Sequence, residues 1–348
     1  MSVSIAVVFA LIAGVFNGSF TAPSKYIHSF SHAKIWLLWC FFGLFFVPML
    51  ITVFSGSDVL YVLTNTPIIS LLTLFVGGVI YGIGLIFFIL SFHRIGIALG
   101  FIINVGTGTV LASLFGLLSV EDASSRFIIF QMIGLVLFII GMLFSIISGK
   151  LREREKQAQD IKHTGRIIHK KGAYFIGIIF ALLAGVASAV EGISFSLGIS
   201  DITKSVANTS YSTVISPISI PWFIMCIGMF IPFFIYFCYR NIKQMDIVDE
   251  DKSKRKKINT GMSYFYTLIM GLLFFLALIS YGLSTRYAGV YTNTIAWPTF
   301  MIFIILTSNF WGWLQGEWRG ASKLSAMMLI VSLVIFIIAE VFFSFSSI

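Results

Sequence analysis

The chain has 348 residues, of which 58% are hydrophobic and only 11% are charged. Soluble domains carry roughly 25% charged residues, so this composition, with a mean hydropathy of +0.99, excludes a soluble globular protein and indicates a membrane protein. The formal net charge is +9. Because the basic residues cluster beside apolar runs, where they orient a protein in a bilayer, we expect a lipid surface and no nucleic acid as the partner.

Ten apolar runs follow one another along the chain, each about 20 residues long or more, which is the length that a helix needs to cross a bilayer core. They cover residues 3–22, 35–54, 68–92, 95–119, 127–148, 173–198, 218–238, 262–282, 290–313 and 324–345. None alternates apolar and polar residues as the strands of a membrane barrel do. The sequence therefore predicts an all-α integral membrane protein with ten transmembrane helices.

The basic residues fall almost entirely on one side of the membrane in this scheme. Of the 23 Lys and Arg residues, 20 lie on the side that includes segments 149–172 and 239–260. The positive-inside rule assigns that side to the cytoplasm. We therefore expect the two segments to be basic cytoplasmic loops and both termini to lie outside. The start, MSVSIAVV, has no positively charged region, so we expect the first run to be retained as a span.

Three segments of the first half of the chain recur in the same order in the second half, which indicates an internal repeat. The pairs are FALIAGV at 9–15 with FALLAGV at 180–186, FILSFHRIG at 88–96 with ISYGLSTRYAG at 279–289, and LVLFIIG at 135–141 with LVIFIIA at 333–339. We predict two five-helix repeats, 1–148 and 173–348, separated by the loop 149–172. Because five is odd, the repeats are inverted, which is typical of secondary transporters that work by alternating access.

Polar side chains inside the runs should face a cavity or another helix, because hydrocarbon offers no hydrogen-bond partner. A sugar needs amide and carboxylate groups for its hydroxyls and an aromatic face for its C–H surface. The candidates for substrate binding are Asn17, Asn104, Ser188, Asn293 and Trp297. Three of them also have a structural interpretation: Asn17 and Asn104 as interhelical hydrogen bonds, and Trp297 beside Pro298 as a packing or interfacial residue at a kink.

Glu191 is a carboxylate inside the run 173–198. It lies about 18 residues after the start of the run, or roughly 27 Å along a helix, so we expect it near the outer boundary of the hydrocarbon. Two interpretations stay open: a hydrated glutamate at the interface, or a proton-coupling residue that lines an outward vestibule. Glu340 has a similar outward depth in the last run, and we expect it in packing or at the lipid interface.

Several short motifs occur in a fixed order along the chain. They are Ala22-Pro23-Ser24-Lys25 with the later Trp36, YGIG at 81–84, RIGIALG at 94–100, KLREREK at 150–156, Lys170-Lys171-Gly172, Ile295-Ala296-Trp297 and Gly316-Glu317-Trp318. Together they resemble the L-rhamnose–proton symporter family of the drug/metabolite transporter superfamily. The resemblance implies ten helices and proton-coupled uptake of a rhamnose-like sugar across a bacterial cytoplasmic (inner) membrane. It also matches Lys25 to a cytoplasmic-end residue of the family.

Other functions stay open on the same scaffold. An exporter of small metabolites or drugs is one, since a fold fixes neither direction nor substrate, and a membrane enzyme or sensor is another. Against an enzyme, the sequence has no HExxH and no GxxxxGK[ST] motif, and Cys40, Cys226 and Cys238 have neither disulfide nor metal-site spacing. We therefore expect no enzymatic activity, no metal and no cofactor.

Overall fold

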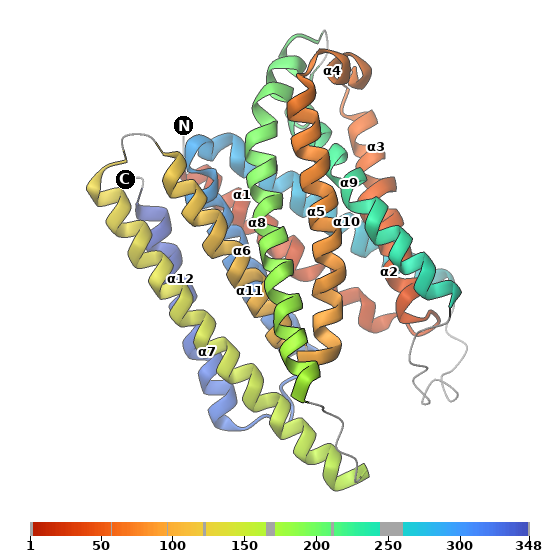
Figure 1. Ribbon diagram of the computed structural model, residues 1–348, viewed down its shortest axis with the longest axis vertical. Coiled ribbons are helices and arrows are strands. Elements are labelled where there is room, and N and C mark those ends of the chain that lie inside the picture. The colour runs from red at the N-terminus through yellow and green to blue at the C-terminus, as the bar shows by residue number, and fades with distance from the viewer. Residues whose placement is uncertain are drawn as a thin grey trace. The chain divides into compact units, whose positions relative to one another are not determined.

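A computed structural model gives the fold. It describes residues 3–56, 58–95, 97–120, 123–164, 171–209, 212–243 and 260–346. Over these residues every regular element is helical and no strand is present, which confirms the prediction of an all-α chain (Figure 1).

The long helices correspond closely to the apolar runs. They are α1 (Val3–Ser19), α5 (Ile68–Ile95), α6 (Ile97–Ser119), α7 (Ser125–Thr164), α8 (Lys171–Ala207), α9 (Ser216–Ile242), α10 (Thr260–Ala288), α11 (Trp297–Leu314) and α12 (Lys323–Phe345). The predicted span 35–54 is one helical run in three parts, α2 (His32–Cys40), the π-helical η2 (Phe41–Phe46) and α3 (Val47–Phe54). The short elements are η1 (Ala22–Tyr26), α4 (Val59–Asn65), the 3-10 turn η4 (Gly289–Tyr291) and the π-helical η5 (Thr292–Ala296).

Nine stretches of the described residues are long and apolar enough to cross a membrane, against ten predicted. The difference arises in Thr260–Leu314, a single stretch of 55 residues that contains both predicted spans 262–282 and 290–313. Within it, α10 ends at Ala288, and Gly289 adopts a positive φ of 58° before α11 begins. Two helices therefore share one uninterrupted apolar stretch.

Two helices continue well beyond their predicted ends. The segment predicted as a basic loop from residue 149 begins as helix, because α7 runs on to Thr164. Lys, Arg, Glu, Gln and Ala are all strong helix formers, so loss of hydropathy there marks the end of the apolar run and not the end of the helix. Helix α8 likewise passes residue 198 and ends at Ala207. Residues 165–170 and 244–259 of the two predicted loops lie outside the described residues.

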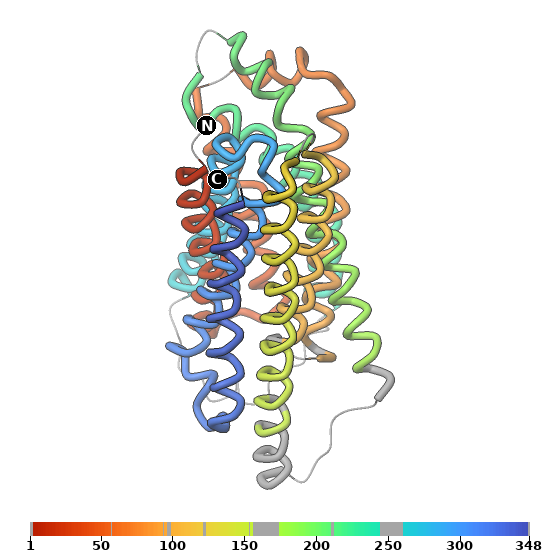
Figure 2. The backbone as a smooth tube through the Cα atoms, turned by 90° about the vertical axis from the view of Figure 1, so that its left-hand side faces the viewer, coloured from red at the N-terminus to blue at the C-terminus, as the bar shows by residue number. Residues whose placement is uncertain are grey.

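The chain folds as two compact units, each assembled from several segments. Unit 1 contains residues 1–14, 84–193 and 284–348, and unit 2 contains residues 15–83 and 194–283. The divisions fall inside α1, α5, α8 and α10. Each unit therefore takes helices from both halves of the sequence. The start of α1 and the end of α12 both belong to unit 1 and lie at the same end of it in the two backbone views (Figures 1 and 2).

In unit 1, α7 and α12 lie side by side along much of their length (Figures 1 and 2). Phe138 and Phe336 pack with their ring centroids 5.1 Å apart. Nearer the other end of the pair, the hydroxyls of Ser148 and Ser325 each donate to the backbone carbonyl of the other residue, at 2.7 and 3.0 Å. The predicted fifth and tenth spans are therefore direct neighbours, joined by aromatic and polar contacts.

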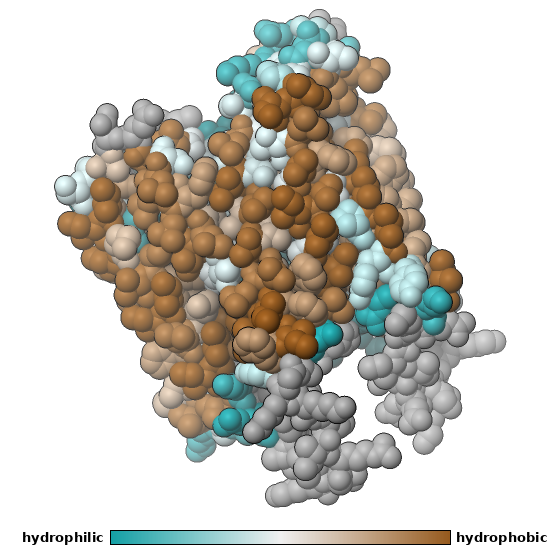
Figure 3. Space-filling model, viewed as in Figure 1, coloured by the Kyte–Doolittle hydropathy of each residue, from teal (hydrophilic) through white to brown (hydrophobic). Residues whose placement is uncertain are grey.

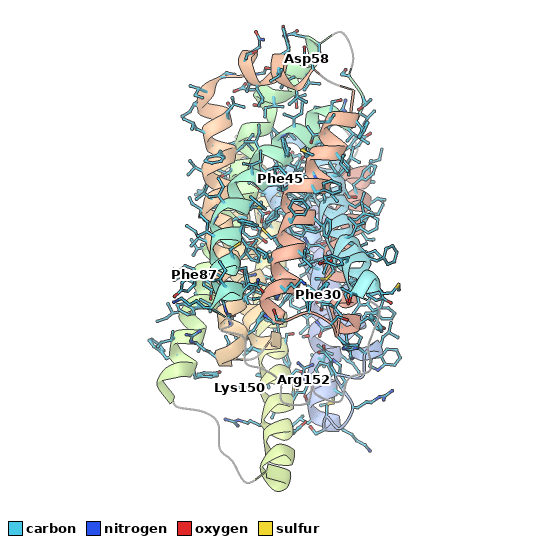
Figure 4. The ribbon with its side chains drawn as sticks, turned by 90° about the vertical axis from the view of Figure 1, so that its right-hand side faces the viewer. Phe30, Phe45, Asp58, Phe87, Lys150 and Arg152 are labelled. Carbon is cyan, nitrogen blue, oxygen red and sulfur yellow. The ribbon has the colours of Figure 1, made fainter. Side chains whose placement is uncertain are left out.

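Charged groups gather where α7 leaves the apolar region (Figure 4). The Arg152 guanidinium is 3.4 Å from the Glu317 carboxylate and lies 4.7 Å from the ring centroid of Trp318. The Glu155 carboxylate accepts a hydrogen bond of 2.8 Å from the backbone N–H of Ser322. These contacts connect α7 to the turn between α11 and α12.

The outward surface of α7 is apolar over most of its length. Its exposed side chains recur every three or four positions, which is the period of one helix face. They are Ile133, Val136, Ile140, Leu143 and Ile147, each 37% to 51% exposed. Figure 3 shows this hydrophobic face ending in hydrophilic residues at the charged end of the helix. An exposed apolar stripe of this kind fits contact with lipid.

In unit 2, α9 packs against α2, η2, α3 and α5. A Cβ atom on Gly82 would lie 2.5 Å from the carbonyl oxygen of Met229, so only glycine permits this approach of α5 to α9. Aromatic rings also pack against one another in this unit, with Phe45 of η2 at 5.5 Å from Phe230 and Phe30 at 4.9 Å from Tyr264 (Figure 4). Large aromatic side chains are buried in this unit, whereas few of the polar residues with a predicted function are.

Candidate substrate site

Helix α6 of unit 1 is the element along which most of the predicted substrate residues gather. It packs closely against α8: a Cβ atom on Gly185 would lie 2.7 Å from the carbonyl oxygen of Asn104, and one on Gly108 would lie 3.1 Å from the Ser188 hydroxyl oxygen. Glycine at these positions allows the helices to approach. Asn104 and Ser188 therefore lie in the same α6–α8 contact, 8% and 3% exposed.

The side-chain amide of Asn104 has an unused acceptor. Its Oδ1 atom is buried and has no hydrogen-bond partner among the residues that the structure describes. A buried acceptor left unsatisfied costs about 1–3 kcal/mol. The amide is therefore a better candidate for binding a ligand hydroxyl than for the interhelical hydrogen bond that was its structural interpretation.

Trp297 packs against α8 at Gly192, the residue that follows Glu191 in that helix. A Cβ atom on Gly192 would lie 2.8 Å from the six-membered ring of the indole. Trp297 is fully buried and Glu191 is 4% exposed. The structure therefore brings the predicted aromatic residue and the α8 segment of the predicted proton-coupling residue together, in the interior of unit 1.

Asn293 belongs to η5 and contacts α6 further along that helix. It is 5% exposed and packs on Gly116, where a Cβ atom would lie 2.8 Å from the Asn293 Cβ. Gly116 follows Asn104 by 12 positions, or about 18 Å of helix. Asn104, Ser188 and Asn293 thus form a row along α6 and not one compact cluster.

The π-helical turn η5 sets the position of Asn293 and Trp297. The backbone N–H of Trp297 donates to the carbonyl of Thr292, five residues earlier. The next residue, Pro298, has no N–H to donate, so the first turn of α11 tolerates this wider backbone. π-helical turns within helices occur frequently at functional sites. The sequence alone does not indicate that this turn is π-helical.

Asn17 and Lys25 belong to unit 2, apart from the row in unit 1. Asn17 lies near the end of α1 and is partly exposed. Lys25 lies in η1 and is exposed, which is compatible with a basic residue that orients a span in the bilayer. The structure therefore does not gather all of the predicted residues in one unit.

Glu191 lies further from the end of its helix than the predicted run 173–198 indicates. Because α8 extends to Ala207, Glu191 lies close to the middle of the helix and not near its end. At 4% exposed, it is also buried in the protein interior. The expectation that it lies near the outer boundary of the hydrocarbon stays a prediction. A buried position disfavours the interpretation as a hydrated surface glutamate.

Glu340 is buried rather than exposed to lipid. Its side chain is 9% exposed, and its Oε1 atom lies 2.6 Å from the Thr299 hydroxyl of α11 and 2.9 Å from the Ser344 hydroxyl. Of the two expectations for this residue, packing is confirmed and the lipid interface is wrong. The polar partners on both sides explain how a carboxyl group is accommodated here.

Two features of unit 1 were not predicted from the sequence. Ser113 of α6 is fully buried, and its hydroxyl has no partner in the described part of the chain; its only sequence signal is a hydroxyl in an apolar run. A cavity of about 530 Å³ also opens between α11 and α12, bounded by Asn309, Trp313 and Trp318 among other residues. None of the predicted substrate residues lines this cavity.

Comparisons with known proteins identify the family to which the chain is similar. A family model described as L-rhamnose-proton symport protein matches residues 1–346. The L-rhamnose-proton symporter of Cronobacter sakazakii is 23% identical over 352 residues, which cover 97% of this chain and 96% of the relative. The symporter of Pectobacterium atrosepticum is 23% identical over 329 residues, covering 92% and 91%.

A solved crystal structure covers 96% of this chain and 96% of its own, with a TM-score of 0.57 and 11% sequence identity. At that identity the likeness concerns the fold alone. The family model spans nearly the whole chain, and the two relatives align over almost their full lengths. The chain therefore belongs to the L-rhamnose-proton symport protein family.

Proposed function

We propose that this protein is a secondary transporter of the bacterial inner membrane that takes up a rhamnose-like monosaccharide together with protons. The observation that carries the proposal is the family match over residues 1–346, with relatives whose names specify rhamnose and protons. The buried polar row along α6 supports it, because a sugar needs hydrogen-bonding groups beside an aromatic face. No feature of the described residues favours an exporter.

We further propose ten crossings in two inverted repeats, 1–148 and 173–348, with both termini outside. The 55-residue stretch Thr260–Leu314 would be about 80 Å long as one helix, whereas a bilayer core is about 30 Å thick. Its break at Gly289 supports two crossings. The start of α1 and the end of α12 lie at the same end of unit 1, which supports an even number of crossings (Figure 2). Inverted repeats support alternating access.

The roles that we assign within unit 1 follow from the chemistry of each side chain. Asn104, Ser188 and Asn293 bind sugar hydroxyls, and Trp297 offers its ring to the C–H face of the sugar. Glu191, buried beside Gly192 and Trp297, takes up and releases the coupled proton. In unit 2, Asn17 is proposed as a further sugar-binding residue.

Purified protein in liposomes tests this function. With an acidic exterior and a neutral interior, labelled rhamnose should accumulate above its external concentration, and a proton ionophore should abolish the accumulation. A panel of related sugars then defines the substrate, since bound ligand also raises the melting temperature by mass action. Accumulation that is unaffected by the ionophore would exclude proton coupling, and sugar efflux driven by the same gradient would favour the exporter.

A further inference from the structure

Glu340 is buried between α12 and the first turns of α11, and only one of its oxygens has partners. Oε1 lies 2.6 Å from Thr299 Oγ1 and 2.9 Å from Ser344 Oγ. Oε2 is buried with no hydrogen-bond partner among the described residues. The side chain as a whole is 9% exposed. An ionised Glu340 would therefore be a buried charge with one oxygen unpartnered, so the protonation state of the group affects the stability of the site.

The Thr299 hydroxyl has one proton but lies close to two acceptors. Its oxygen is 2.8 Å from the Ile295 carbonyl oxygen and 2.6 Å from Glu340 Oε1. Among the described residues, the carbonyl four residues earlier is a recurring acceptor of threonine hydroxyls, at 2.7 to 3.2 Å. Six other threonines make this bond: Thr64, Thr66, Thr73, Thr109, Thr203 and Thr267. If Thr299 does the same, the 2.6 Å contact needs a proton from Glu340.

Among the residues that the structure describes, no charged group faces Glu340 from the elements packed against it. Helix α11 and η5 contain no titratable residue. On α7, Gly134 faces Phe343 and Gly141 faces Phe336, and the segment between the two glycines, LVLFII, has no titratable side chain. On α12 itself, the other charged residue is the first of the helix. An ionised carboxylate buried without a cation costs several kcal/mol, a cost that the neutral acid avoids.

We propose that Glu340 is a proton-binding site held as a neutral carboxylic acid, whose O–H donates to Thr299 and fixes the start of α11 on α12. Thr299 then donates to the carbonyl of Ile295, which belongs to η5. This chain of hydrogen bonds ends in the π-helical turn that carries Asn293 and leads into Trp297. Glu340 is thus a positioning residue for these two side chains. Its role in transport rests on the proposed function, whereas its protonation state does not.

Infrared spectroscopy of the full-length protein in lipid at neutral pH tests the protonation state. The difference spectrum between wild type and Glu340→Gln should contain the C=O stretching band of a protonated carboxylic acid. Thr299→Val removes the hydroxyl acceptor and should shift this band, whereas Thr299→Ser retains the hydroxyl and should leave it in place. Loss of carboxylate bands in Glu340→Gln, with no acid band, would overturn the proposal.

Transport in liposomes tests the positioning role. Glu340→Gln keeps an N–H donor for Thr299 and should retain uphill uptake, whereas Glu340→Leu should reduce uptake about five- to tenfold through the loss of one hydrogen bond. If Glu340→Gln abolishes uphill uptake but keeps exchange, the residue carries the transported proton and the positioning role is wrong. If the wild type itself transports no sugar, the proposed function fails, and the infrared result still decides the state of Glu340.

Discussion

Gly192 lies against the indole of Trp297, so close that a Cβ atom on the glycine would be 2.8 Å from the ring. This contact joins α8 to the start of α11 one residue after Glu191. It places a buried carboxyl group, a buried aromatic ring and a π-helical turn within the same part of unit 1. The proposed sugar and proton sites depend on this arrangement.

Gly192→Val should disturb this contact. The added side chain has no space beside the indole, and overpacking of an interior typically costs about 1–3 kcal/mol. We expect a lower melting temperature in detergent and reduced sugar uptake. Gly312→Ala is the control, because the Cβ atom would lie 3.3 Å from the movable carboxylate of Glu317 and should be tolerated. Equal stability of Gly192→Val and wild type would contradict the contact.

Asn104→Ala should change stability and binding in opposite senses. Removing the unsatisfied buried acceptor should leave the sugar-free protein equally or more stable, by up to about 1 kcal/mol. Loss of the bond to the sugar should raise KM about tenfold, the equivalent of 1.4 kcal/mol. Asn309→Ala is the matched control: its amide donates to the Ile305 carbonyl at 2.9 Å, beside the cavity between α11 and α12. Its KM should not change.

The polar contacts between α7 and the end regions of α11 and α12 should contribute unequally to stability. Ser148→Ala and Ser325→Ala each remove a buried hydrogen bond and should lower the free energy of unfolding by about 0.5–1.5 kcal/mol. Glu317→Gln should cost less than about 1 kcal/mol, because that carboxylate is 45% exposed. Denaturation of the three variants under one set of conditions checks the order, and a reversed order would contradict it.

The 55-residue apolar stretch should cross the membrane twice. Single cysteines in a cysteine-free background at Met262 and Trp313 should react with an impermeant reagent from one face, and a cysteine at Val290 from the other. All three positions have exposed side chains, at 42%, 66% and 67%. Reaction of all three from the same face would exclude the second crossing and, with it, the inverted repeat.

The helices were predictable because hydrocarbon selects for long apolar runs, which hydropathy detects directly. The polar ends were not: residues 149–164 and 199–207 stay helical through their propensity and their contacts, which leave no trace in hydropathy. α4 was missed for a different reason: its seven residues are too few for a crossing. The helix begins directly after the Asp58 cap.

The residue types of the candidate site were predictable, but its geometry was not. Asn104, Ser188, Asn293 and Trp297 stand out as polar or aromatic groups in apolar runs. The structure places the first three along α6 and Trp297 against Gly192 of α8. Their spacing depends on which glycines face which helix and on the π-helical turn η5, both of which are tertiary features. The burial of Glu191 likewise depends on tertiary packing, and its position in the middle of α8 depends on where that helix ends.

The most direct test of the central claim is uptake by Glu191→Gln in liposomes, measured in two modes. The account predicts that this variant loses accumulation driven by an inward proton gradient but retains exchange of labelled for unlabelled rhamnose, since glutamine keeps the shape of the side chain without the titratable group. Unchanged gradient-driven accumulation would contradict a role for Glu191 in proton coupling, and loss of both modes with intact folding would assign the residue to sugar binding instead.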